Sequence, residues 1–564
     1  MKFLLLCTFI AASSVFASSA DPSPSPKADK AVTERLFKGI AKLDGAGDRP
    51  DLQLQGEQYW QDESGDTRGF AYYGYKYGKA GRFEEPVANA DFGYLTNADR
   101  PKLGAACPQS SIQIPGLTFF SRNLTMNEDC LFLDVYVPPV KKDQEKACPV
   151  LFFIYGGGFK VGDKDLYNAS ILARAVDAVV VVANYRVSAF GFLSTGDEAA
   201  RGNWAIADLK LALNWTLNNI AAFNGDPAKI TLFGESAGAA LTSALMLDDK
   251  VRAQVFAAVA MSGTMVNSWA VRQDPKKGTN LLGQALECPI DTSAGVIACL
   301  KNRTVEQILN ASHHVLEKAG MVMHYAPVID GHHIPKAPAQ IIRDRGTSPS
   351  TGRVGTFISG YLREDSAFFL LLTPHLLNAT FNITIVNQLL LGYPIANGAA
   401  ACPQALPGNL QLIHEFYGIT EATSPEDLRQ LYYKISTHAM FGVGSIDESK
   451  LYSAHPGSTD QLYLISVDSN YRDLGAFHFL DILHLFRGKF DVLLKEKMND
   501  AFTQAMHQFF RQVAYDGRAD GPSFGNDGNY LELNEQAKWV PKKQDFAPLL
   551  AFWRGLAEKP CPTA

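Results

Sequence analysis

Short apolar segments alternate with helical ones between about residues 145 and 265, and this alternation limits the possible fold more than any other feature. The segments 149–154 and 178–185 have the length and β-branched character of strands that are buried on both faces. A helix is predicted next, because apolar residues recur at spacings of three and four: Ile206, Leu209, Leu213, Leu217 and Ile220. A strand at 229–233 and a helix at 237–247 follow. This order predicts an α/β fold with a parallel sheet that is covered on both faces.

A Gly-x-Ser-x-Gly sequence, Gly234 to Gly238, stands directly between the last of these strands and the last helix. A serine at such a turn projects its Oγ from the sheet edge, and the crowded turn requires glycine two residues to either side. The pentapeptide alone is a weak signal, but the strand before it and the helix after it supply the expected context. We therefore predict that Ser236 is a nucleophile, against the alternative of an ordinary structural serine.

A run of three glycines, Gly156 to Gly158, follows the strand at 149–154. Without side chains, the backbone N–H groups of such a loop can approach a developing negative charge closely, as the oxyanion of ester cleavage requires. The alternative is a simple flexible turn, which would leave the end of a core strand poorly braced.

Composition and charge exclude several classes of protein. The 564 residues carry 52 Lys and Arg against 58 Asp and Glu, a net charge of −6, which argues against a nucleic-acid partner. The length alone would suggest roughly three or four domains. No Cys or His cluster has zinc-ligand spacing, and the pairs His313–His314 and His332–His333 are interpreted as surface or loop residues that would face opposite ways in a strand. We therefore expect neither a metal nor a cofactor.

The first twenty residues are typical of a signal peptide rather than of the fold. Lys2 precedes an apolar run at 3–10 that is too short to cross a bilayer, and small residues end at Ala17 or Ala20. Residues 21–32 are expected to be a flexible leader, and no later run is long enough for an integral membrane span. A signal anchor is the alternative, but seven Asn-x-Ser/Thr sequons also favour a secreted glycoprotein.

The cysteines support an oxidising compartment. Cleavage would remove Cys7 and leave seven of the eight cysteines, an odd number. Cys107 with Cys130, and Cys288 with Cys299, are close enough in sequence to form disulfides that close short loops. The sequence does not assign disulfide partners to the other three cysteines, Cys148, Cys402 and Cys561.

From about residue 65 to 557 the chain resembles the type-B carboxylesterase/cholinesterase family of α/β-hydrolases. The resemblance rests on ordered motifs: Gly81-Arg82-Phe83, Asn127 to Leu131, Tyr155 to Phe159, Asn184 to Leu193, Gly225-Asp226-Pro227, the serine turn and Pro327 to Gly331. It implies one catalytic domain over residues 21–564, built on a mixed, mostly parallel sheet, which overrides the expectation from length. It also implies two structural ion pairs, Arg82–Glu128 and Arg186–Asp208.

The resemblance also implies the partners of the serine, which in this fold follow in the order acid and then histidine. His478, three residues after Gly475, matches the family's histidine loop, whereas His484 lies in an apolar helical segment and is expected to pack. Counting from Gly360 puts Asp365 at the acid position, with Glu364 as the alternative.

The implied roles follow the usual triad chemistry. Ser236 attacks the ester carbonyl, His478 takes the serine proton, and Asp365 orients the imidazole. Oxyanion donors are expected from three N–H groups, those of Gly157, Gly158 and Ala237. Glu235 and Ser262 match family positions that surround the triad.

The implied substrate is a neutral or lipid ester. Cholinesterases carry a tryptophan within the loop closed by the first disulfide, where it faces a quaternary ammonium; counting back from Cys130 puts Phe120 there, which weakens the choline interpretation. Trp269 matches a position on the acyl side of the family's pocket, although a packing role is equally open. A non-catalytic adhesion or binding relative is the alternative function, but Ser236, His478 and an acid argue against it.

Overall fold

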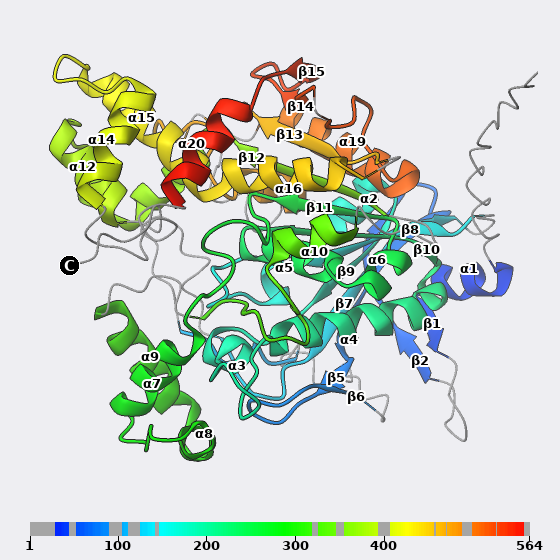
Figure 1. The fold of residues 1–564 in the computed structure, drawn as a ribbon. Coiled ribbons are helices and arrows are strands. Elements are labelled where there is room, and N and C mark those ends of the chain that lie inside the picture. The colour runs from blue at the N-terminus through cyan, green and yellow to red at the C-terminus, as the bar shows by residue number, and fades with distance from the viewer. Residues whose placement is uncertain are drawn as a thin grey trace, which may run out of the picture.

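The computed structural model describes residues 29–43, 52–89, 104–110, 124–141, 146–318, 325–345, 355–392, 406–455, 458–469, 471–487, 499–525 and 527–557. Its centre is an eleven-stranded sheet (Figure 1) in the order β15-β14-β13-β12-β11-β10-β8-β9-β7-β4-β3. The bounds are β3 Glu57–Gln61, β4 Thr67–Lys76, β7 Phe132–Lys141, β8 Cys148–Ile154, β9 Val179–Ala183, β10 Gly225–Glu235, β11 Ala257–Met261, β12 Thr356–Leu362, β13 Gln461–Ile465, β14 Asn529–Leu533 and β15 Trp539–Lys543. Two small sheets pair β1 (Ile40–Leu43) with β2 (Leu52–Gln55) and β5 (Gly78–Lys79) with β6 (Val87–Ala88).

The strands from β9 to β14 in this order pair in parallel, whereas β15, β7, β4 and β3 pair antiparallel with their neighbours. The mixed, mostly parallel sheet of an α/β-hydrolase is therefore confirmed. β9 shows why these segments form central strands: its valines 179–182 are all fully buried, as strands covered on both faces require.

Helices cover both faces of the sheet. α4 (Trp204–Asn219), α5 (Ala237–Met246) and α16 (Val443–Ser453) lie together on one face, while α2 (Ser170–Val176), α17 (Leu480–Phe486) and α19 (Asp500–Asp516) pack together on the other. Phe233 of β10 points towards the second group, because its ring contacts Phe486 and Phe510.

The remaining helices lie around this centre. Their bounds are α1 Lys30–Phe37, α3 Ser188–Phe192, α6 Asp249–Gln254, α7 Pro275–Ala285, α8 Ser293–Lys301, α9 Val305–Lys318, α10 Pro338–Arg345, α11 Pro374–Leu377, α12 Ile383–Gly392, α14 Leu406–Tyr417, α15 Pro425–Thr437 and α20 Ala547–Ala557. Shorter helical turns are η3 Lys164–Leu166, η4 Ile220–Phe223, η5 Asp365–Leu372 and the π-helical η7 His438–Gly442.

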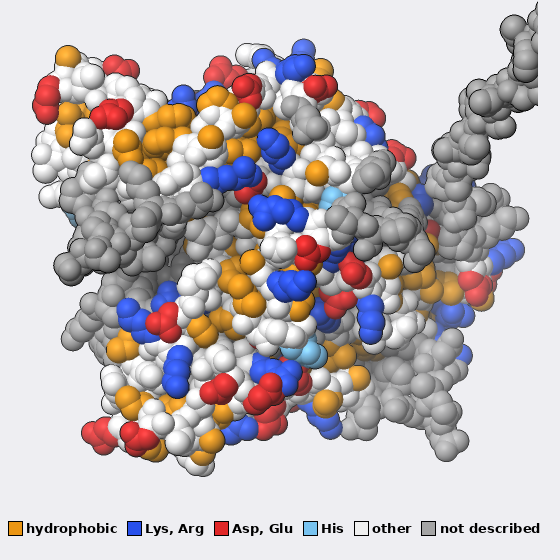
Figure 2. All heavy atoms as spheres, viewed as in Figure 1, with side chains coloured by type: hydrophobic (Ala, Val, Ile, Leu, Met, Phe, Trp, Pro, Cys, Tyr) orange, Lys and Arg blue, Asp and Glu red, His pale blue; other side chains and the backbone are white. Residues whose placement is uncertain are grey.

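Covalent and ionic links agree with the expectations. Disulfides join Cys107 to Cys130 and Cys288 to Cys299. The pairs Arg82–Glu128 and Arg186–Asp208 are both present, the second almost fully buried. On the face seen in Figure 2, Lys and Arg side chains are interspersed with Asp and Glu. Among the described residues, no helix combines the length and apolar character needed to traverse a bilayer.

Candidate active site

Ser236 occupies a strained turn between β10 and α5. Its φ of 60° and ψ of −125° lie in a region that side-chain-bearing residues rarely adopt. Such a conformation costs about 1–3 kcal/mol and persists only where the surroundings hold it. Here the Ser236 N–H donates to the Met261 carbonyl of β11 at 2.8 Å, and its carbonyl accepts from the Ala240 N–H of α5 at 3.1 Å. The turn is therefore clamped between a strand and a helix.

Close packing explains Gly238 of this turn and Gly156 of the glycine loop. A Cβ on Gly238 would lie 2.0 Å from the Ile154 carbonyl oxygen, and a Cβ on Gly156 would lie 2.9 Å from Ser236 Cβ. Neither distance is sterically possible without movement of the backbone. The glycine loop after β8 therefore lies directly against the serine turn.

The three proposed oxyanion donors are available at this junction. Gly157 has a φ of +114°, and its carbonyl accepts from the Lys160 and Val161 N–H groups, which fixes the loop. Within the described part of the chain, the N–H groups of Gly157, Gly158 and Ala237 donate to no other residue. Free, fixed donors next to a nucleophile are what an oxyanion requires.

Asp365 lies at the start of η5 and is completely buried. Its Oδ1 accepts from His478 Nδ1 at 2.6 Å, and its Oδ2 accepts from Ser262 Oγ at 2.6 Å and from the Leu362 N–H at 3.0 Å. The His478 N–H also donates to the Asp365 carbonyl at 2.9 Å. Both carboxylate oxygens of Asp365 therefore accept hydrogen bonds, and Asp365 holds His478 through its side chain and its backbone carbonyl.

Glu364, the alternative acid, contacts the histidine loop differently. Its Oε2 accepts from the Ala476 N–H at 2.9 Å and its Oε1 from Arg363 Nε at 2.5 Å. Burial raises the pKa of Glu364, although the Arg363 charge opposes this effect. The structure therefore places Asp365 on the imidazole and Glu364 on the backbone that carries it.

The second nitrogen of the imidazole faces another carboxylate. His478 Nε2 lies 3.0 Å from Oε1 of the buried Glu235, at ion-pair distance but outside hydrogen-bond geometry. Burial lowers the pKa of His478, but the charges of Glu235 and Asp365 outweigh burial and raise it overall. Ser236 Oγ forms no hydrogen bond with any residue that the structure describes. The structure thus joins the histidine to the acid, and does not join it to the serine.

Three phenyl rings enclose the imidazole. Phe441 stacks on His478 with centroids 4.6 Å apart, and Phe368 and Phe369 each lie 5.9 Å away. Trp269 packs against Phe441 and donates from Nε1 to the Met440 carbonyl at 2.6 Å. The neighbourhood of the candidate base is therefore apolar and aromatic.

Sequence reasoning missed Asp481, which is fully buried in α17. Burial and the nearby charges of Glu235 and Asp365 raise the pKa of Asp481 well above its ordinary value, so its neutral form is favoured. Its signal in the sequence is a single acidic residue inside the apolar segment 479–486. The aromatic ring of Phe441 gave no comparable signal, because it comes from a distant helical turn.

Other expected residues are placed as follows. His484 is buried, with Nδ1 2.8 Å from Thr503 Oγ1, in the packing position expected for it. Cys148 is buried at the start of β8, with Asn224 Nδ2 3.9 Å from its Sγ. Three residues lie outside the described part of the chain: Phe120, Cys402 and Cys561.

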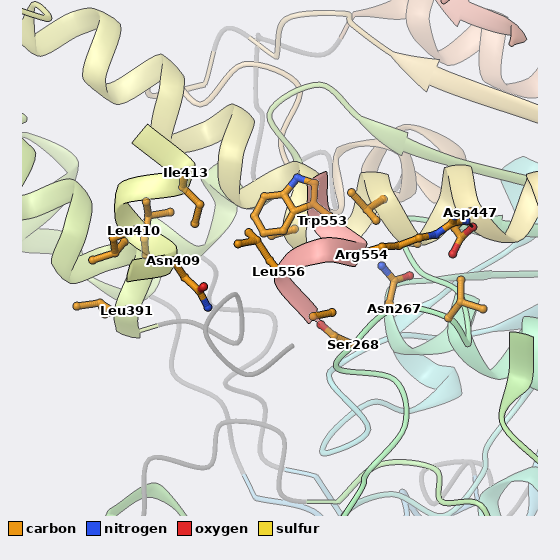
Figure 3. Close-up of a pocket in the computed structure, with 16 residues that line it drawn as sticks. Asn267, Ser268, Leu391, Asn409, Leu410, Ile413, Asp447, Trp553, Arg554 and Leu556 are labelled. Carbon is orange, nitrogen blue, oxygen red and sulfur yellow. Dashed lines mark hydrogen bonds and ion pairs between the residues drawn. The ribbon is translucent and has the colours of Figure 1, made fainter. Parts of the chain in front are cut away.

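A separate cavity of about 180 Å³ lies between α12, α14, α16 and α20 (Figure 3). Its walls include Asn409 and Ile413 on one side and Trp553 on the other. Ser236, Asp365 and His478 do not line it. Asn267 on its wall also contacts the site, because its Nδ2 donates to the Met440 carbonyl at 2.7 Å.

The sequence is similar to those of several known proteins. Neuroligin-2 of Mus musculus is 33% identical over 299 residues, which cover 47% of this chain and 35% of that protein. Bile salt-activated lipase of Mus musculus is 28% identical over 474 residues, covering 77% of this chain and 76% of the lipase. Carboxylesterase 1D of Rattus norvegicus is 26% identical over 520 residues, covering 85% and 86%.

The share of each relative's length that matches this chain differs among the three proteins. The matched part of the chain spans about a third of the length of the neuroligins, but most of the lipase and the esterase. The profile of the Carboxylesterase family matches residues 53–553, from β2 to α20 and through every strand of the central sheet. The chain therefore belongs to the carboxylesterase family.

Proposed function

We propose that the chain hydrolyses carboxylic esters through an acyl-enzyme on Ser236. The observation that carries the proposal is the buried Asp365–His478 pair beside a strained serine turn. His478 Nε2 takes the proton of Ser236 Oγ as the oxygen attacks the ester carbonyl, and the leaving alcohol receives that proton. Water then attacks the acyl-enzyme, which releases the acid and restores the serine.

The remaining groups have defined parts in this proposal. The N–H groups of Gly157, Gly158 and Ala237 receive the negative charge of the tetrahedral intermediate. His478 Nε2 contacts Glu235, the residue before Ser236, which supports a short movement of the imidazole to the serine on substrate binding. Catalytic hydrogen bonds are often long in substrate-free enzymes and form with the substrate.

We further propose a neutral ester with an apolar acyl group as the substrate. The rings of Phe368, Phe369 and Phe441 lie around the imidazole, and Trp269 packs against Phe441; these rings favour apolar groups over charged ones. Two similar proteins are named as a lipase and a carboxylesterase, which supports the same class.

The remaining proposals concern the chain as a whole. We propose that residues 21–564 form one secreted catalytic domain after cleavage near Ala17 or Ala20. Two disulfides support an oxidising compartment.

A non-catalytic binding protein is the second candidate function. The observation that favours it is the contact of His478 Nε2 with Glu235 in place of a hydrogen bond to Ser236. The similarity to neuroligin-2 over 47% of the chain also supports it.

Hydrolysis of p-nitrophenyl butyrate by Ser236→Ala separates the two functions. We expect kcat to fall by about 10⁴-fold or more, with the thermal unfolding midpoint unchanged. Ser268→Ala removes an exposed hydroxyl from the same chain and should keep full activity. Equal turnover by Ser236→Ala and wild type would refute the role of Ser236. A wild-type protein that cleaves no ester in an acyl-length series would favour the binding protein.

A further inference from the structure

Two loops that are far apart in sequence bring two histidines and a glutamate together. Glu85 lies just before β6, and His332 and His333 follow the isolated bridge at Val328. His333 Nε2 lies 3.2 Å from Glu85 Oε1, and the two imidazole centroids are 4.5 Å apart. One candidate ligand atom from each of the three residues lies within 4.8 Å of the others.

A tight turn explains why the neighbouring histidines share one side of the chain. The expectation that they face opposite ways applies to a strand, whereas Gly331 has a φ of +72° and begins a turn. Asp330 Oδ1 accepts from the His332 N–H at 3.0 Å and from the Ile334 N–H at 2.8 Å. The turn is joined to α4 through Val328, whose N–H and carbonyl both bind the side chain of Asn203. The histidines are therefore presented by a fixed backbone.

We propose that Glu85, His332 and His333 form a binding site for a divalent transition-metal ion such as Zn²⁺. Two imidazoles and a carboxylate suit Zn²⁺, whereas Ca²⁺ and Mg²⁺ prefer sites made of oxygen atoms. With bonds of about 2.0–2.2 Å, tetrahedral ligand atoms lie about 3.3 Å apart. The separation of Glu85 and His333 already matches this value, and rotation of the exposed His332 side chain would shorten the other two separations. A water molecule completes the coordination.

Glu85 is accessible from solvent. Its side chain is 50% exposed, so an ion can reach it from solvent.

Lys210 opposes binding at His333. Its Nζ lies 3.5 Å from His333 Nδ1 and 2.7 Å from Asp248 Oδ2. When Nε2 binds a metal, Nδ1 carries the proton, and metal-bound histidines usually donate that proton to a carboxylate or carbonyl. An ammonium group in that position weakens the site. Lys210→Gln supplies an amide oxygen instead, and we expect it to tighten binding about tenfold.

A bound ion would join segments that are 248 residues apart in sequence. Because the unfolded chain does not hold these residues together, saturating Zn²⁺ should raise the thermal unfolding midpoint.

Calorimetric titration of the full chain with Zn²⁺ tests the proposal. We expect one site per chain in wild type, and an affinity for Zn²⁺ that is at least tenfold lower in Glu85→Gln and in His332→Asn. His375→Asn, which replaces an exposed histidine elsewhere, should bind as wild type does. All three variants should keep the unfolding midpoint of the metal-free protein, since both ligands are exposed.

Several outcomes would overturn the proposal. They are the absence of saturable binding by wild type, or equal affinity in wild type, Glu85→Gln and His332→Asn. A Lys210→Gln protein that binds no more tightly than wild type would overturn Nε2 as the ligand atom of His333.

Discussion

At the scale of single residues, His478 is held between two carboxylates. Asp365 binds Nδ1 and Glu235 faces Nε2, and both charges stabilise the imidazolium. A general base must be neutral before it can take a proton. In the proposed mechanism, Glu235 would therefore contribute, with Asp365, to the pH at which this histidine can act as a base.

Replacement of Glu235 by Gln should move the pH dependence of hydrolysis. kcat/KM should rise with pH as the imidazolium loses its proton, and loss of the Glu235 charge lowers that pKa. At the 3.0 Å separation observed, we expect a shift to lower pH of at least about one unit, even with the screening of bulk water. The pH profile of p-nitrophenyl butyrate hydrolysis measures the shift. Glu364→Gln is the matched control, because that carboxylate contacts the loop backbone; an equal shift in both variants would contradict the explanation.

The two neighbouring acids should differ in their effect on rate. Asp365→Asn disrupts the hydrogen bond to Nδ1 and should lower kcat by about 10³–10⁴-fold. Glu364→Gln keeps an oxygen that can accept from Ala476 and should lower kcat by less than about tenfold. Steady-state kinetics of both variants decide the assignment, and the reverse order would make Glu364 the acid.

At the scale of elements, a buried carboxyl joins α16 to α5. Glu448 is fully buried, its Oε1 accepts from Ser243 Oγ at 2.5 Å, and its Oε2 has no hydrogen-bond partner. Burial raises its pKa from 4.5 to about 7. The folded state therefore holds a proton that the unfolded chain releases between these two values.

This contact predicts a pH-dependent stability. Below the unfolded pKa, Glu448 is protonated in both states and does not lower the free energy of unfolding. As pH rises from about 4.5 to 7, the buried carboxyl lowers that free energy increasingly, and above pH 7 the loss is complete. The difference in unfolding free energy between Glu448→Gln and wild type should therefore change by about 3 kcal/mol between pH 4.5 and pH 8, in favour of the variant at pH 8. Urea unfolding at both pH values measures it. A difference that stays constant with pH would show that folding does not shift the pKa of Glu448.

The elements that position the serine could be predicted because their signals are local. The strand expected at 149–154 is β8 (Cys148–Ile154), and the helix expected at 237–247 is α5 (Ala237–Met246). The strand expected at 229–233 extends from Gly225 to Glu235, because parallel partners on both sides lengthen it. Counting from Gly360 in β12 indicates Asp365, which begins η5 just after that strand and contacts His478.

Contacts between distant segments could not be predicted in this way. Phe441 reaches His478 from a π-helical turn, and nothing in the local sequence indicates that the two rings stack. The contact between Glu235 and Nε2 depends on how the histidine loop packs on the serine turn. The meeting of Glu85 with His333 likewise depends on the packing of two loops. Local sequence patterns therefore predict helices and strands, whereas contacts between distant segments depend on how these elements pack.

At the scale of the whole molecule, Arg82 joins three distant parts of the chain. Its guanidinium forms a bidentate pair with Glu128 and donates to three carbonyls at the end of α8, those of Leu300, Lys301 and Arg303. Only a planar group with several donors can bind all of these at once.

Arg82→Lys should therefore destabilise the protein by about 2 kcal/mol, because a single ammonium cannot replace these hydrogen bonds. Denaturant unfolding measures the loss. Arg201→Lys is the matched control, since Arg201 pairs with Glu198 at the surface and the exchange should cost less than about 0.5 kcal/mol. Equal stability of the two variants would show that Arg82 contributes no more than a surface pair.

The three side chains of the proposed triad follow three strands of one sheet, and this placement has a consequence for biogenesis. Ser236 follows β10, Asp365 follows β12 and His478 follows β13, so the three side chains meet only after strands separated by more than two hundred residues have aligned. A ribosome-bound chain that ends before residue 478 can form much of the sheet but has no base. In the proposed mechanism, ester cleavage would therefore begin only late in synthesis, after residue 478 has emerged, although β14 and β15 still follow it.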